Sequence, residues 1–201
     1  MTASFEPKKI RSFLAILLPD DVKSQIYHYT SPLRRLPLDL KWVAKENYHL
    51  TLKFFGSLTK SQIDRVNLYL NELAPQVNSF FLNYGGWGLF PNQRHPRVLW
   101  VGLGGAALNA LQKLWLELEN DLSKLGFPKE EKRFHPHITL GRFRSAANIE
   151  LLFPIMEKSP LAKEMGSFPV ADLHLMESKL GPTGPSYASL SAYPLRTKGP
   201  S

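Results

Sequence analysis

The chain has 201 residues, 43% hydrophobic and 21% charged, a composition that permits a globular domain with a buried core. It contains no cysteine, which excludes disulfides, a thiolate nucleophile and cysteine-ligated zinc or iron–sulfur sites. The formal net charge of +8 favours a polyanionic partner. No apolar run reaches the length of a membrane span, so we expect a cytoplasmic protein without membrane contact.

Apolar runs bounded by turn-forming residues predict strands, and 3.6-residue periodicity predicts helices between them. The expected elements, in chain order, are a strand at 11–19, a helix from Asp20 or Asp21 to about Arg35, strand segments at 41–43 and 47–56, a helix from Thr59 or Ser61 to about Leu73, a strand, glycine-rich turn and loop over 79–96, a strand at 97–104, a helix over 106–125, a strand at 137–143, a short helix over 147–158, and strands at 167–178 and 186–195. We expect 41–43 and 47–56 to form a strand pair or one bent strand.

This order of elements contains a repeat. The strand at 11–19, a helix and the strand carrying His49 form one unit, and the strand at 97–104, a helix and the strand carrying His137 form another. Two similar units predict an α+β fold of two pseudo-symmetric lobes, in which two mainly antiparallel sheets flank a central groove with helices on the outside. We expect residues 1–201 to form a single domain, with a disordered tail over about 196–201.

The two histidine strands share a four-residue pattern of histidine, apolar residue, threonine and apolar residue. The pattern reads His49, Leu50, Thr51, Leu52 in the first copy and His137, Ile138, Thr139, Leu140 in the second. With 6 histidines and 7 threonines in the chain, roughly 0.2 His-x-Thr sequences are expected by chance. Strand alternation places the histidine and threonine of each copy on one face. A lone histidine on an apolar strand is more often a hydrogen-bonded core residue, but its recurrence favours a functional pair facing one groove.

Two imidazoles and two hydroxyls suit a particular chemistry. An imidazole with a pKa of about 6.5 gives or takes a proton near neutral pH, so one can activate water while the other protonates a leaving alkoxide. Threonine hydroxyls can donate hydrogen bonds to the oxygens of a phosphate. The set lacks the carboxylates or thiolates that usually complete a metal site, so we expect no metal and no cofactor.

Four stretches carry a resemblance to a known family over nearly the whole chain. They are RSFLAILLP, WVAKENYHLTLKFFG, RFHPHITLGR and LMESKLGPTGPSYASL. With these motifs the chain resembles the two-histidine (2H) phosphoesterases, and within them the RNA 2′,3′-cyclic phosphodiesterases, also described as 2′-5′ RNA ligases. The resemblance implies the bilobal 2H phosphoesterase fold and hydrolysis of RNA or nucleotide 2′,3′-cyclic phosphates to 2′-phosphates.

The resemblance also implies roles for individual residues. His49 is the implied proton donor and His137 the implied proton acceptor, with Thr51, Thr139 and Arg142 holding the phosphate. Ideal alternation from His137 would turn Arg142 away from the groove, and a bulge at Gly141 is the way to turn it inward.

Several alternatives stay open at the sequence level. The same histidines would suit 2′-5′ RNA ligation or cleavage of 2′-5′ linkages, and a non-catalytic protein that binds RNA ends is the rival from another class. His135 is assigned to the surface in preference to the groove, whereas groove and sheet positions are equally weighted for His174. Phe13 and Trp42 are assigned to packing in preference to base stacking. We expect a monomer that binds RNA or a nucleotide carrying a 2′,3′-cyclic phosphate.

Overall fold

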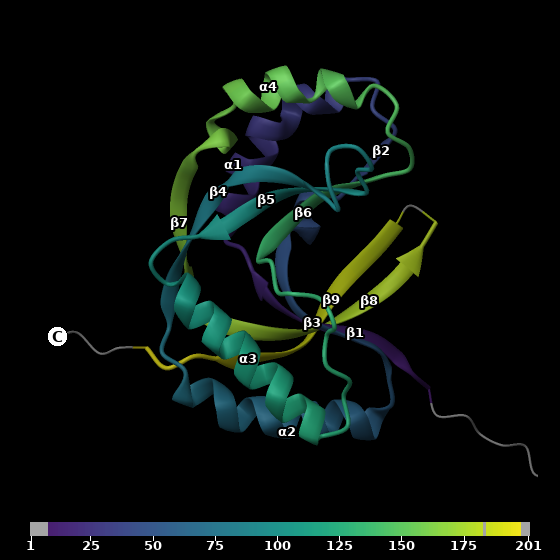
Figure 1. The fold of residues 1–201 in the computed structure, drawn as a ribbon. Helices are drawn as coiled ribbons and strands as arrows, with labels where there is room; N and C mark the ends of the chain where they lie inside the picture. Colours follow the sequence, from purple (N-terminus) through teal and green to yellow (C-terminus); the bar gives the residue numbers. More distant parts are fainter. Residues whose placement is uncertain (1–7, 183, 198–201) are drawn as a thin grey trace, which may run out of the picture.

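The computed structural model describes residues 8–182 and 184–197, and its strands form one antiparallel sheet (Figure 1). The nine strands of this described part are β1 (Ile10–Leu17), β2 (Leu40–Trp42), β3 (His49–Leu58), β4 (Phe80–Phe90), β5 (Val98–Gly104), β6 (His137–Phe143), β7 (Glu164–Val170), β8 (Asp172–Gly181) and β9 (Gly184–Pro194). The order is β7-β4-β5-β6-β3-β1-β8-β9, and β2 pairs with β6. The α+β class predicted from the sequence is confirmed.

The sheet consists of two halves that meet at the two histidine strands. β3, β1, β8 and β9 form the first half, and β6, β5, β4 and β7 form the second. One residue pair, Leu50 opposite Ile138, joins β3 to β6. The two predicted sheets are therefore continuous through the middle of both motifs. This contact brings the two histidine-bearing strands together at the centre of the molecule.

The helices cross from one half to the other. α1 (Asp20–Thr30) follows β1 but packs over β4, where the Tyr84 hydroxyl bonds Gln25 Oε1 at 2.7 Å. α3 (Leu108–Lys124) follows β5 but packs on β3, where Trp115 Nε1 donates to the Leu52 carbonyl at 3.1 Å. Figure 1 shows α1 with α4 (Phe153–Lys158) on one side of the sheet region, and α3 with α2 (Lys60–Leu73) on the other. Each half of the sheet is thus covered by a helix that follows a strand of the other half.

Local sequence explains where these helices start and stop. Thr59 begins α2 with a capping box, because its hydroxyl accepts from the Gln62 amide while the Gln62 side chain accepts from the Thr59 amide. Gly126 follows α3 with φ of +86°, a conformation that glycine adopts without strain. Regularly spaced leucines of α2 and α3 enter the buried core between helices and sheet. No helix in the described part of the chain is long and apolar enough to cross a membrane.

Some expected elements are placed differently. β2 pairs with β6 and not with β3, so the strand segments at 41–43 and 47–56 are neither a pair nor one strand. β4 continues through the glycines at 85 and 86, where its register with β5 shifts, so the predicted turn is an irregularity within a strand. The predicted strand at 167–178 is two strands separated at Ala171, with β7 beside β4 and β8 beside β1.

The predicted C-terminal tail starts too early. Arg196 is anchored, since its amide donates to the Val77 carbonyl and its Nε donates to Asn78 Oδ1 at 2.9 Å. Residues 198–201 lie outside the described residues.

Candidate active site

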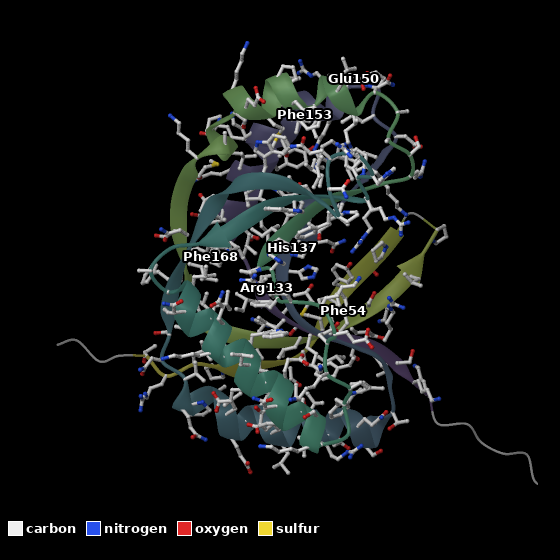
Figure 2. All side chains as sticks on the ribbon, viewed as in Figure 1. Phe54, Arg133, His137, Glu150, Phe153 and Phe168 are labelled. Carbon is white, nitrogen blue, oxygen red and sulfur yellow. The ribbon has the colours of Figure 1, made fainter. Side chains whose placement is uncertain are left out.

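A cavity of about 290 Å³ opens where the two halves of the sheet meet. His49 and Thr51 line it from β3, and His137 and Thr139 line it from β6. The remaining lining residues are Lys41, Trp42, Val43, Ala44, Asn47, Phe54, Arg142, Gly184, Pro185 and Tyr187. The structure therefore brings the two motifs together as their repetition predicts. Figure 2 labels His137 near the middle of the molecule and Phe54 on the side of the β8–β9 hairpin.

A bulge in β6 turns Arg142 into this cavity. Gly141 lies opposite Leu99 while Thr139 lies opposite Trp100, so Leu140 is an extra residue in β6. Leu140 and Gly141 are consecutively buried, and Arg142 consequently faces the same side as Thr139 and lines the cavity. The bulge that the sequence analysis needed for Arg142 is present.

β3 has the same bulge at the same place in its motif. Lys53 lies opposite Leu14 while Thr51 lies opposite Ala15, so Leu52 is the extra residue. As a result Phe54, five residues after His49, lines the cavity as Arg142 does five residues after His137. Phe54 was not among the residues predicted from the motifs, although applying the spacing of Arg142 to the first copy would have found it.

Both histidines are oriented by the same backbone hydrogen bond. His49 Nδ1 lies 2.7 Å from the Asn47 carbonyl, and His137 Nδ1 lies 2.7 Å from the His135 carbonyl. A carbonyl oxygen only accepts, so each Nδ1 carries a proton and donates it. Each neutral imidazole therefore keeps Nε2 as its proton-accepting atom. His49 Nε2 lies 3.0 Å from Thr51 Oγ1, so a threonine hydroxyl already contacts the reactive nitrogen of the first histidine.

Aromatic rings support each imidazole from the side. The centroid of the His49 ring lies 4.9 Å from that of Phe13 and 5.3 Å from that of Tyr187. His137 has Phe90 at 5.0 Å, and Trp100 stands 6.4 Å away. The rings fix the imidazole planes and remove water from their flanks.

This environment favours the neutral form of both histidines. Burial lowers the pKa of His49 to about 4; the hydrogen bond to the Asn47 carbonyl opposes the shift, and the positive charges of His137 and Arg142 add to it. Burial also lowers the pKa of His137, opposed by the His135 carbonyl and assisted by Arg142. Without a ligand, both imidazoles are mainly neutral at pH 7, and the cavity presents two bases beside fixed cations.

The cavity is suited to an anion. Lys41 and Arg142 supply positive charge, the threonines supply hydroxyl donors, and no Asp or Glu is among the lining residues that the structure describes. Within residues 8–182 and 184–197 no three His, Cys, Asp or Glu side chains gather in a way that could hold a metal ion. A phosphate oxygen could therefore find hydrogen bonds from both motifs at once.

The remaining sequence candidates divide between cavity and surroundings. His135 and His174 do not line the cavity; the His135 ring lies 6.0 Å from Phe90, and His174 Nδ1 contacts Ser189 Oγ at 3.3 Å. Trp42 forms part of the wall and also packs against the hydrophobic core, in keeping with its assignment to packing. The guanidinium of Arg34 lies over the Trp42 ring, 4.3 Å from the ring centroid.

Comparison with known proteins places this cavity in context. The chain is 34% identical over 182 residues to an RNA 2′,3′-cyclic phosphodiesterase of Thermotoga maritima, covering 90% of this chain and 93% of that one. It is 29% identical to the protein of the same name from Methanothermobacter thermautotrophicus, over 93% and 100% of the two chains. The crystal structure of E. coli LigT complexed with 3′-AMP superposes with a TM-score of 0.75 at 26% identity, covering 94% of this chain and 99% of LigT.

The match to the family follows the internal repeat of the chain. A family model described as LigT like Phosphoesterase matches residues 16–100 and again residues 103–187. Each match contains one histidine motif, at nearly the same distance from its start, so the two halves of the chain are two copies of one family unit. The chain therefore belongs to the LigT-like phosphoesterase family.

Proposed function

We propose that this protein is an RNA 2′,3′-cyclic phosphodiesterase, a hydrolase that opens the cyclic phosphate at an RNA or nucleotide end. The observation that carries the proposal is one cavity in which two oriented imidazoles, two threonines and Arg142 converge. Relatives over nearly the full chain have this name, and the related LigT structure contains a nucleotide, 3′-AMP. Both histidine motifs lie in one chain and converge on one cavity, so we propose that a monomer is active.

The two histidines divide the proton transfers. His137 Nε2 takes a proton from water, whose oxygen forms a bond to phosphorus. The bond from phosphorus to the 3′-oxygen breaks, and His49 Nε2 donates a proton to that oxygen. The phosphate stays on the 2′-oxygen. The Nδ1 hydrogen bonds to the Asn47 and His135 carbonyls keep both reactive nitrogens directed at the substrate throughout.

The threonines and Arg142 act on the charge that develops at phosphorus. Their side chains come from both motifs and already line the cavity before substrate binds, so these groups need to move little to reach the transition state. The bulge in β6 contributes by presenting Arg142 next to Thr139. Among the described lining residues no carboxylate or thiolate is available to complete a coordination shell beside the histidines, so we propose that the reaction proceeds without a metal ion.

Bound substrate favours the protonated form of His49, which is the form that can donate a proton. The pKa of His49 is lowered to about 4 in the free protein, where burial disfavours the charged ring. A phosphate anion bound beside it favours the imidazolium and raises this pKa. Binding is therefore expected to draw one proton into the site, and that proton is the one delivered to the leaving oxygen.

Phosphorus NMR of a nucleoside 2′,3′-cyclic phosphate, incubated with the protein and excess EDTA, tests the proposal. We expect loss of the cyclic resonance and appearance of a 2′-monophosphate alone. An activity that disappears with EDTA and returns with zinc or manganese would contradict the mechanism. Binding of the cyclic nucleotide without turnover would instead favour an RNA-end-binding protein.

A further inference from the structure

A second cavity of about 420 Å³ adjoins the first. The two share Phe54, Arg142, Pro185 and Tyr187, so they are successive parts of one groove. The second cavity extends along β1 and β8 away from the histidine pair, and its other lining residues are Arg11, Ser12, Phe13, Gly56, Ser178 and Leu180. Apart from Phe13, whose ring supports the His49 imidazole, these additional residues have no part in the mechanism proposed above.

The lining of this second cavity combines cations with exposed apolar surface. Arg11 projects from β1 and Arg142 from β6, and in the described part of the chain neither forms an ion pair. Phe54 is 55% exposed and Leu180 is 75% exposed, although both are large apolar side chains. The nearby carboxylate of Glu177 is engaged by Lys179 at 3.3 Å. The cavity therefore offers two uncompensated guanidinium groups beside an aromatic ring and an aliphatic side chain.

This combination matches a nucleotide. Arginine pairs with phosphate oxygens, and bases stack on aromatic faces with little dependence on sequence. A phosphate held by the two histidines leaves the rest of an RNA chain to extend along the groove, which continues past Phe54 and Arg142 into the second cavity because both residues line the two cavities. The route, the charge and the stacking surface coincide in one place.

We propose that the second cavity is a subsite for the nucleotide that precedes the cyclic-phosphate end, with Arg11 contacting the phosphodiester that joins it to the terminal nucleotide. This inference rests on the proposed function, which places the cyclic phosphate between His49 and His137. It identifies the preferred substrate class as oligonucleotide ends, in preference to free cyclic mononucleotides.

The test compares a nucleoside 2′,3′-cyclic phosphate with a dinucleotide that ends in the same group. We expect wild-type kcat/KM to be about tenfold higher for the dinucleotide, because one further charge-assisted contact forms. Arg11→Gln should lower kcat/KM for the dinucleotide about tenfold more than for the mononucleotide. Arg65→Gln, which removes the same charge from the outer helix α2, should leave both values unchanged. Equal effects of Arg11→Gln on the two substrates would overturn the subsite.

A second variant and a second readout make the outcome independent of turnover. Leu180→Asp places a carboxylate in the cavity and should reproduce the selective loss. For an oligonucleotide ending in a 2′-phosphate, Arg11→Gln should weaken binding and reduce the slope of log K against log salt concentration by about 0.7, the value for one phosphate contact on a single strand. An unchanged slope and affinity would refute the subsite, whether or not cyclic substrates are cleaved. A failure to cleave cyclic substrates would separately refute the proposed function.

Discussion

The two halves of the molecule use one backbone device to present different side chains. In both, a bulge after the threonine reverses strand alternation, so the fifth residue after the histidine faces the cavity. That residue is Phe54 in the first half and Arg142 in the second. The bulge itself contains Lys53 in one half and Gly141 in the other. The two units therefore share the histidine and threonine of the motif and differ in the residue that follows it, which is aromatic in the first half and cationic in the second.

The histidines, which both halves share, should have the largest effect when they are removed. His49→Ala and His137→Ala should each reduce kcat by roughly 10²- to 10⁴-fold, the usual contribution of a general acid or base. The fold should be retained, because both rings border the cavity. Circular dichroism and steady-state kinetics on the cyclic nucleotide measure the two quantities. A folded variant with near wild-type turnover would assign that histidine a structural role.

Substitutions within the two bulges should lower the free energy of unfolding by different amounts. Lys53 is 2% exposed and pairs with Glu119, itself 4% exposed, at 2.7 Å, while also donating to the Pro128 carbonyl. Lys53→Met leaves a buried carboxylate without its cation, and we expect about 3–5 kcal/mol of lost unfolding free energy.

The matched change in the second half is Gly141→Ala. Its added Cβ would meet Leu40 Cγ at 2.9 Å, a contact expected to cost about 1–3 kcal/mol. Urea denaturation compares both variants with wild type. Because the helices cross between halves, we propose a single domain, so one transition is expected for each protein. Two separate transitions would contradict this.

Substitution of the residue that follows each motif should affect different substrates. Arg142→Gln should lower kcat/KM by about 10- to 100-fold on any phosphodiester, since a charged hydrogen bond to phosphate is lost. Phe54→Leu should mainly raise KM for nucleotides and have little effect on a base-free phosphodiester, because only base stacking is weakened. Kinetics on one substrate of each kind distinguish the two effects. A Phe54→Leu defect of equal size on both substrates would show that the ring shapes the phosphate site.

The pH dependence of the rate should show the effect of the lowered pKa of His49. A donor whose pKa is about 4 in the free protein loses its proton well below neutral pH, so above about pH 7 kcat/KM should fall about tenfold per pH unit. The corresponding limb of kcat should lie at higher pH, because bound phosphate raises the pKa of His49. Rate profiles and NMR titration of the imidazole signals provide the measurements. A His49 pKa near 6.5 in the free protein would contradict the account.

Local sequence patterns predicted most of the helices and strands. They did not predict how the strands pair, because pairing depends on residues far apart in the chain. The strands carrying His49 and His137, and the helix beginning after Thr59, follow from alternation and capping within a few residues. The split at Ala171 did not, because both flanking segments have strand-like sequences and only the tertiary fold sends them to opposite halves. The inward turn of Arg142 depends on one extra residue opposite β5, and alternation within a single strand cannot reveal such an insertion.

The division of labour between the histidines is tested most directly with a phosphodiester whose leaving group is a nitrophenolate. Such a group departs without a proton, so it needs a base but no acid. We expect this substrate to restore part of the activity of His49→Ala and to leave His137→Ala inactive. Equal restoration of both variants, or restoration of His137→Ala alone, would contradict the assignment of His49 as the proton donor.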